Sequence, residues 1–367
     1  MSKLFSPFTL RGLELANRIV VSPMCQYSAV EGSAQDWHMI HLGSLALSGA
    51  ALLCIEATAV EAIGRITPGD LGLYSDANEA ALKPVVAAIR KHAPIAVAMQ
   101  LAHAGRKASC KLPWEGGAQI PPDAPDGWRT VAPSPIPFND GEAPPLALDE
   151  AGMARIKKAF VAAAQRAERL GLDALEIHSA HGYLLHEFLS PLSNKRDDNY
   201  GGSLENRMRF PLEVFEAVRA VFPANKPVGV RVSASDWVDG GWDIEQTKAY
   251  AAELKTRGAD WIDCSSGGNS PAQKIPLSQG YQVPFSDAVR NTAGLPTIAV
   301  GLITDPDYAE GLIESGKADL VALARGMLFD PRWPWHAAAK LGAHAVAPPQ
   351  YLRAAPREAK DVLIQAK

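Results

Sequence analysis

The sequence contains little cysteine. Only four cysteines occur among 367 residues, and no two of them stand in a C-x-x-C pair. They are Cys25, Cys54, Cys110 and Cys264. This spacing argues against a disulfide framework and against a cysteine-rich zinc site, and it is typical of proteins from a reducing compartment. We therefore expect a cytoplasmic protein.

The sequence also lacks a large excess of charge of one sign and has no long apolar runs. The chain has 36 basic and 40 acidic residues, a net charge of −4, which argues against a nucleic-acid partner bound through a basic surface. No apolar run approaches the ~20 residues that a membrane-spanning helix needs, and the first residues lack the apolar stretch of a signal peptide. Because 47% of the residues are hydrophobic, the chain can bury a large core. Fibrous, disordered and membrane-spanning classes are excluded.

Glycine and proline, by contrast, are abundant, at 30 and 28 residues. Gly171, Gly258 and Gly316 each precede a short apolar run, and the segments before Gly171 and Gly258 have helical periodicity. Glycine in the left-handed conformation commonly ends a helix. The apolar runs lack polar alternation, which is typical of parallel strands buried on both faces. Asp305-Pro306 and Asp330-Pro331 predict two later helix starts.

Eight apolar runs can be counted, with helical segments between most of them. They are Ile19–Ser22, Leu52–Glu56, Ile95–Gln100, Leu175–His178, Val228–Ser233, Trp261–Ser265, Thr297–Val300 and Leu320–Ala324. Eight strand–helix units predict an α/β fold, a single (β/α)8 TIM barrel over residues 1–367. An open sheet with an appended lobe is the alternative. We expect a long loop excursion over 113–145, after the third strand, and a C-terminal tail over 343–367.

The carboxyl ends of barrel strands carry the active site. Gly301 and Arg325 follow the seventh and eighth runs, where such barrels bind phosphate. Glycine lets the backbone approach an anion closely, and arginine can bind it in bidentate fashion. We therefore favour a phosphorylated ligand over the alternative, in which Gly301 is a turn residue and Arg325 forms a surface ion pair.

His178-x-x-His181-x-Tyr183 follows the fourth run and is the densest polar cluster. Two imidazoles could bind a metal, but no carboxylate set completes a zinc or binuclear site, so we expect no metal. Two neutral histidines can instead polarise a carbonyl, with Tyr183 as a proton donor. Cys25 is either a small buried residue or a nucleophile that needs a base. Lys107 is expected to be a solvated charge unless the ligand is anionic.

Longer motifs identify a family. The chain carries SPMCQY over 22–27, QLAHAGRK over 100–107, HSAHGY over 178–183, SPLSNKR over 190–196 and DNYGGSLENR over 198–207. With these motifs the sequence resembles the old yellow enzyme family of flavin-dependent ene-reductases, most of all its thermophilic-like class, which includes the xenobiotic reductases. The resemblance covers essentially the whole chain, and the last two motifs are long and in the family's order.

The resemblance implies non-covalent FMN at the barrel mouth. Arg231 would lie by the N1/C2 region, where positive charge favours the anionic reduced flavin. Cys25 would tune the flavin and would not attack substrate. By matching motif, the FMN-binding residues would be Ser22, Pro23, Met24, Cys25, Ala57, Gln100, Arg231, Gly301, Ala324 and Arg325.

The implied reaction is ping-pong: NADPH or NADH reduces FMN, and an alkene activated by a carbonyl or nitro group then takes hydride on its β-carbon. His178 and His181 would bind the activating oxygen, Tyr183 would protonate the α-carbon, and Tyr27 would contact substrate. Arg353, and with it Tyr351, resembles tail residues that reach a neighbouring subunit's site, which implies a homodimer or a dimer-based homotetramer. Leu302 stands where some xenobiotic reductases carry Trp, so their substrate preferences do not transfer.

Two other functions stay open from the residues alone. A metal-dependent barrel hydrolase or lyase would use His178 and His181 as ligands. A non-enzymatic flavin- or ligand-binding module would bind its ligand through the same phosphate site but would not catalyse a reaction.

Overall fold

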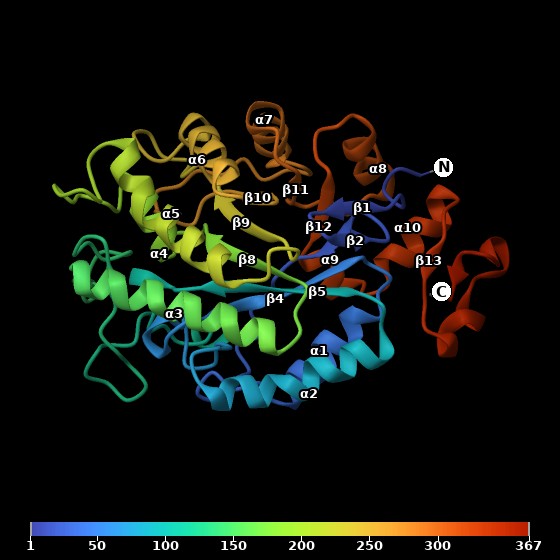
Figure 1. Ribbon diagram of the computed structural model, residues 1–367, viewed down its shortest axis with the longest axis horizontal. Helices are drawn as coiled ribbons and strands as arrows, with labels where there is room; N and C mark the ends of the chain where they lie inside the picture. Colours follow the sequence, from blue (N-terminus) through green and yellow to red (C-terminus); the bar gives the residue numbers. More distant parts are fainter. Residues whose placement is uncertain (1, 366–367) are drawn as a thin grey trace.

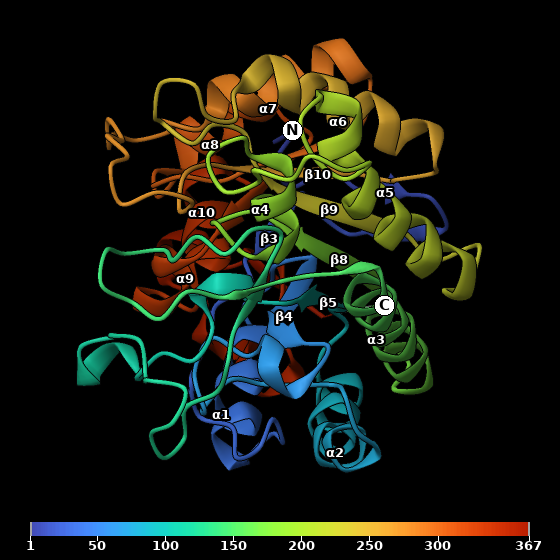
Figure 2. The ribbon, with the colours of Figure 1, turned by 90° about the vertical axis from the view of Figure 1, so that its left-hand side faces the viewer.

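Eight parallel strands close into a barrel in the computed structural model, which describes residues 2–365. Figure 1 shows the barrel from the side and Figure 2 along its length. Going round the barrel, the strands are β3 (Ile19–Val21), β4 (Leu52–Ala59), β5 (Ala96–Ala102), β8 (Ala174–Ser179), β9 (Val228–Ser233), β10 (Ile262–Ser265), β11 (Thr297–Ala299) and β12 (Leu320–Leu323). Each predicted apolar run forms one of these strands, which confirms the predicted (β/α)8 barrel.

The barrel strands are buried along their whole length, because helices cover the outside and side chains fill the inside. The covering helices are α1 (Asp36–Ala46), α2 (Asp76–His92), α3 (Glu150–Arg169), α5 (Leu204–Val221), α6 (Ile244–Thr256), α7 (Val283–Ala293), α8 (Pro306–Glu314) and α10 (Trp333–Leu341). Two short helices, α4 (Leu184–Leu189) and α9 (Arg325–Phe329), follow β8 and β12. Both were missed by periodicity because each spans fewer than two turns.

Helix ends follow the predicted chemistry at most positions. Gly171, Gly258 and Gly316 have φ values of 76°, 89° and 70°, the left-handed region in which glycine ends a helix. Asp305 caps α8, and its carboxylate accepts the N–H of Asp307 at 3.2 Å. The helix start predicted at Asp330-Pro331 is wrong. Asp330 instead accepts the N–H two residues ahead and forms a turn, so α10 begins only at Trp333.

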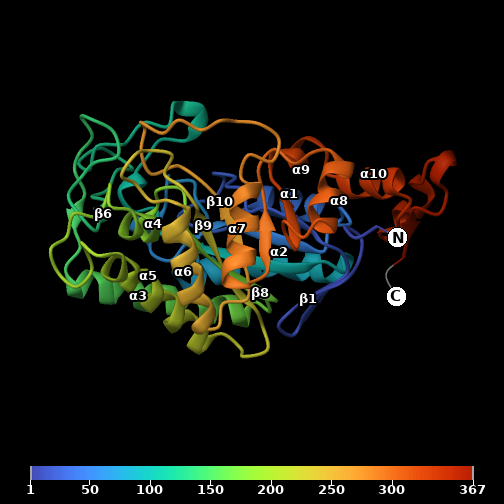
Figure 3. The same ribbon diagram turned by 90° about the horizontal axis from the view of Figure 1, so that it is seen from above.

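The long excursion and the tail lie at opposite ends of the barrel (Figures 1 and 3). The excursion over 113–145 contains the short helix η3 (Pro113–Glu115) and the strand β6 (Val131–Ala132), which pairs with β7 (Leu146–Ala147). In the tail, β13 (Ala345–Val346) pairs with β14 (Leu363–Ile364), and the short helices η4 (Pro349–Ala354) and η5 (Arg357–Ala359) lie between them. At the tail's end of the barrel, β1 (Phe8–Leu10) and β2 (Leu13–Leu15) form a hairpin. Within residues 2–365, each helix is too short or too polar to span a membrane.

Candidate functional site

Three side chains from β8 and the loop after it form a tight cluster. The ring of His178 lies 5.1 Å from that of His181 and 4.9 Å from that of Tyr183, centroid to centroid, in edge-to-face geometry. His178 belongs to β8, while Tyr183 is the N-cap residue of α4. His181 reaches the cluster because its backbone takes a φ of 59°, a strained left-handed conformation for a non-glycine residue. The structure therefore brings together the three residues that the motif predicted.

Both histidines are held as neutral imidazoles. Burial, with Arg231 nearby, lowers the pKa of each imidazole well below 6.5. His178 Nδ1 accepts the N–H of Ala180 at 3.2 Å, so the ring proton stays on Nε2. His181 Nε2 lies 2.7 Å from the hydroxyl oxygen of Ser265. When Ser265 donates in that contact, His181 carries its proton on Nδ1, and the pair presents two N–H groups.

Tyr183 is a protonated phenol at neutral pH. Burial raises its pKa well above 10, and the nearby Cys25 and Tyr27 act in the same direction. A phenol that keeps its proton in a desolvated site can donate that proton to a substrate.

Lys107 is not the solvated charge that the sequence predicted. Its ammonium donates to the carbonyl oxygens of His181 and Gly268, both at 2.8 Å, and lies 5.2 Å from the centre of the Tyr183 ring. The two carbonyls belong to the loops after β8 and β10, so Lys107 joins the loops that shape the cluster. Burial lowers its pKa to about 8. The motif that contains Lys107 was the only signal for this position.

The loop after β3 carries Ser22, Pro23, Met24, Cys25 and Tyr27. It is fastened by Glu56 in the middle of β4, whose carboxylate accepts the N–H of Gln26 at 2.9 Å. Tyr27 has a φ of 52°, so this loop too is held in a strained conformation. Burial raises the pKa of the Cys25 thiol. A thiol that stays protonated is a poor nucleophile, which disfavours the nucleophile alternative for Cys25.

A hollow of about 170 Å³ opens at the ends of β11 and β12. Gly301 lines it with a φ of 131°, and a Cβ there would come within 3.2 Å of Tyr281 and Gln282. Ala324, Arg231 and Arg325 also line it, and Leu302 beside Gly301 is 38% exposed. Arginine and a backbone free of side chains suit a phosphate. Gln282, whose amide donates to the carbonyl of Val300, was not foreseen because no sequence pattern marks it.

A polar network fills the barrel interior next to this hollow. Gln100 Nε2 donates to Glu176 Oε1 at 2.8 Å, and Arg231 Nε lies 3.1 Å from Asp263 Oδ2. Trp261 Nε1 donates to the other oxygen of Glu176 at 3.2 Å. Sequence reasoning singled out Gln100 and Arg231 but missed their acidic partners, because these lie on neighbouring strands far away in the chain.

One predicted site residue, Arg353, lies elsewhere. Arg353 is exposed in η4, in the tail at the far end of the barrel, and does not enter the site of its own chain. A metal centre finds no support, because in the part of the chain from 2 to 365 no three His, Cys, Asp or Glu side chains are grouped to hold an ion. Ala57, in β4, faces a narrow space that Tyr183 also lines.

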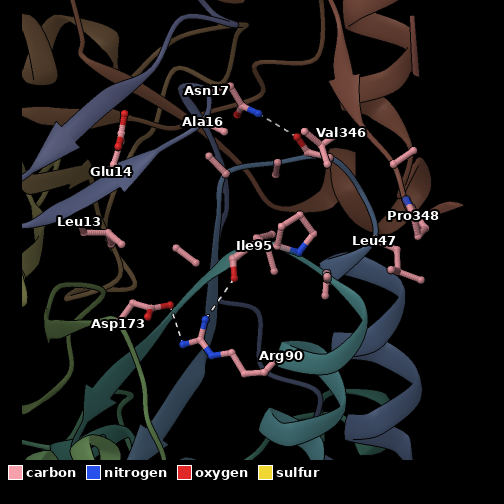
Figure 4. A pocket seen from close by; sticks show the side chains of 18 residues that line it. Leu13, Glu14, Ala16, Asn17, Leu47, Arg90, Ile95, Asp173, Val346 and Pro348 are labelled. Atoms are coloured by element: carbon pink, nitrogen blue, oxygen red, sulfur yellow. Dashed lines mark hydrogen bonds and ion pairs between the residues drawn. The ribbon is translucent and has the colours of Figure 1, made fainter. Parts of the chain in front are cut away.

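The amino-terminal end of the barrel carries a different hollow, of about 520 Å³ (Figure 4). Three of its polar side chains already have partners. Arg90 forms an ion pair with Asp173 at 2.6 Å, and Asn17 donates to the carbonyl of Gly49 at 2.9 Å. Because these groups satisfy one another, and because barrel active sites form at the other end, this hollow is not the functional site.

Comparison with known proteins shows the family of the chain. Residues 3–343 match the NADH:flavin oxidoreductase / NADH oxidase family. The chain is 44% identical over 352 residues to an NADPH dehydrogenase of Geobacillus thermodenitrificans, covering 95% of this chain and 98% of that one. It is 43% identical over 356 residues to an NADPH dehydrogenase of Listeria innocua, covering 96% and 99%.

Solved structures share the architecture. Morphinone reductase superimposes with a TM-score of 0.77 at 30% identity, covering 94% of this chain and 91% of that one. An old yellow enzyme homologue from Zymomonas mobilis superimposes with a TM-score of 0.76 at 24% identity, covering 99% and 97%. The second similarity concerns the fold alone.

Proposed function

The chain belongs to the NADH:flavin oxidoreductase / NADH oxidase family and is an NAD(P)H-dependent FMN oxidoreductase of the old yellow enzyme type, and from this premise we propose that it is an ene-reductase. The proposed substrates are alkenes conjugated to a carbonyl or nitro group. One observation carries the proposal: the imidazole ring of His181 and the phenol ring of Tyr183 lie 5.1 Å and 4.9 Å from the neutral imidazole ring of His178. Such a set can bind an oxygen acceptor and deliver a proton beside it.

The residues at the barrel mouth fit FMN. The hydroxyl oxygen of Ser22 is buried and has no hydrogen-bond partner among residues 2–365, so it is free for a ligand. Arg231, in β9, and Arg325, at the start of α9, both line the hollow. We assign the ring to Ser22–Cys25, Ala57, Gln100 and Arg231, and the phosphate to Gly301, Ala324 and Arg325. When bound, FMN supplies the hydride acceptor for NAD(P)H and the hydride donor for the alkene.

The protein's own groups prepare the alkene. His178 and His181 would donate to the activating oxygen, which draws electron density from the β-carbon. Tyr183 would give its proton to the α-carbon, and Tyr27 would contact substrate from the loop after β3. His178 is buried, and His181 and Tyr183 are half-buried, so these hydrogen bonds act in a medium less polar than bulk water.

The proposal is tested on the purified protein. It should be yellow, and with NADPH or NADH it should reduce cyclohexenone or maleimide. A colourless protein that takes up no added FMN contradicts the assignment of the barrel mouth to the cofactor. Bound FMN without turnover of any activated alkene would instead favour a flavin-binding module.

Lys107 should strengthen Tyr183 as an acid. Its positive charge lies over the ring that becomes negative when the proton leaves, an interaction of a few kcal/mol at an effective dielectric of about 20. We expect Lys107→Met to slow the alkene half-reaction by about 10-fold or more. Since burial lowers the pKa of Lys107 to about 8, the wild-type rate should fall as pH rises through that value. Lys107→Arg should retain the rate and move the fall to higher pH.

Stopped-flow measurement of the two half-reactions checks this. The NADPH half-reaction should change little in either variant. Equal slowing of both half-reactions in Lys107→Met would mean that the lysine only holds the loops together.

Arg353 should act in a neighbouring subunit. We propose that the tail, exposed at the far end of the barrel, brings Arg353 to the site of a second copy in a homodimer or dimer-based homotetramer. Arg353→Ala should then weaken binding of a phenolic ligand in the assembled protein. Sedimentation gives the oligomeric state, and titration of flavin absorbance gives the affinity. A monomer, or an oligomer with unchanged affinity, removes Arg353 from the site.

A further inference from the structure

The barrel interior holds more negative than positive side chains. Glu176 on β8 and Asp263 on β10 are each 2% exposed, and the cation between these strands is Arg231 on β9, 7% exposed. Arg231 pairs with Asp263 at 3.1 Å. Glu176 is left with two neutral donors, Gln100 and Trp261. One carboxylate of the two therefore has no ion-pair partner.

An unpaired buried carboxylate is costly, so the network favours a proton on it. Burial is the main cause that raises the pKa of Glu176, and the negative charge of Asp263 raises it further, while Arg231 opposes both. The other titratable group that faces Glu176 is Cys54 on β4, and burial raises the pKa of that thiol so that it stays neutral. Nothing else on the packed strands supplies a compensating cation within residues 2–365.

Glu176 is linked to the proposed flavin site by strand register. Gln100 lies opposite Glu176, and Arg231 lies opposite both His178 and Asp263. Gln100 and Arg231 are the residues assigned above to the flavin ring. Charge added to the ring is therefore felt by Glu176 through two side chains that already contact the network.

We propose that Glu176 is a redox-linked proton acceptor, which takes up one proton from solvent when the bound FMN gains two electrons and returns it when the alkene is reduced. The inference rests on the proposed placement of FMN. In balanced form, NAD(P)H would give hydride to FMN and leave as NAD(P)+, and one proton from solvent would convert the Glu176 carboxylate to the acid; that proton would return to solvent when the alkene takes the hydride. Glu176 does not touch substrate; it acts through Gln100 and Arg231.

The number of protons taken up per electron pair tests the proposal. The slope of the midpoint potential against pH gives the number of protons that the FMN-loaded protein takes up per electron pair. For the wild type, measured from about pH 6 to pH 9, we expect that number to exceed one over part of the range. Glu176→Gln should show one proton throughout. Its potential should match the wild type at low pH, where Glu176 is neutral in both states, and exceed it at high pH, where the wild type carries the extra negative charge.

Asp70 offers a matched control. It is a second buried carboxylate near the site, with a pKa raised to about 7 by burial, and it accepts hydrogen bonds from Thr67 and Ile66. The Asp70→Asn variant should still take up the extra proton when the bound FMN is reduced. If Asp70→Asn loses it and Glu176→Gln retains it, the proton belongs to Asp70 and the proposal is overturned.

A measurement on the wild type covers the case in which Glu176→Gln does not fold. Infrared difference spectra of the oxidised and reduced protein should gain a carboxylic-acid C=O band on reduction near neutral pH. No such band, or a Glu176→Gln potential displaced equally at every pH, contradicts the proposal. A protein that binds no FMN would instead contradict the placement of the cofactor.

Discussion

Tyr183→Phe will slow the alkene half-reaction by about 10²- to 10⁴-fold, the usual contribution of a positioned general acid. The substitution removes only the phenolic hydroxyl, and the ring can keep its edge-to-face contact with His178. Hydride transfer from NADPH needs no proton from Tyr183, so that half-reaction should be nearly unchanged. Stopped-flow absorbance of the flavin measures the two steps separately.

Tyr250→Phe is the matched control for Tyr183→Phe. Tyr250 is fully buried, and its hydroxyl lies 3.4 Å from that of Ser179 behind β8, outside the cluster. The Tyr250→Phe variant should carry out both half-reactions at the wild-type rates. Slowing of both half-reactions by the same factor in Tyr183→Phe would show that Tyr183 shapes the site and does not supply the proton.

His178→Ala and His181→Ala should each slow the alkene half-reaction by about 10²- to 10³-fold, as expected when one donor to a developing negative oxygen is lost. Affinity for phenolic ligands should fall in both variants. In the wild type, the pair should bind such ligands with an affinity that shows no transition near pH 6.5. Since the pKa of each imidazole is lowered well below 6.5, both rings stay neutral as pH falls through that value.

Two controls sharpen the test of the histidine pair. His92 is exposed at the end of α2, so His92→Ala should change neither rate nor affinity. Ser265→Ala should act through His181 and Gln282, because the Ser265 hydroxyl lies 2.7 Å from His181 Nε2 and 3.4 Å from Gln282 Oε1. A change in ligand affinity centred near pH 6.5 in the wild type would mean that at least one of the two rings is solvated and titrates normally.

The barrel could be predicted from local patterns. A parallel strand covered on both faces must be apolar along its whole length, and a helix that packs on it must repeat its apolar positions every 3.6 residues. Both patterns involve residues that are close together in the chain, so the eight strands can be predicted without the tertiary structure. The short helices α4 and α9 escaped because one or two turns carry too few positions for a period to appear.

The candidate site was predicted in part for a related reason. Residues that follow a barrel strand lie at its carboxyl end, so His178, His181 and Tyr183 could be placed together before any coordinates were known. Arg353 could be assigned to the tail, but its role depends on a second chain, and no pattern within one chain reports that contact.

What the sequence by itself determined is the set of strands, the turns that end the helices and the motifs at the strand ends. What only the tertiary structure decided is the environment of each charge. Lys107 is half-buried against the carbonyls of His181 and Gly268, and Glu176 lies in a barrel layer with one cation for two carboxylates. Desolvation and pairing depend on residues 32 to 161 positions away, brought together by the closure of the barrel, and that information is not present in any local stretch of the chain.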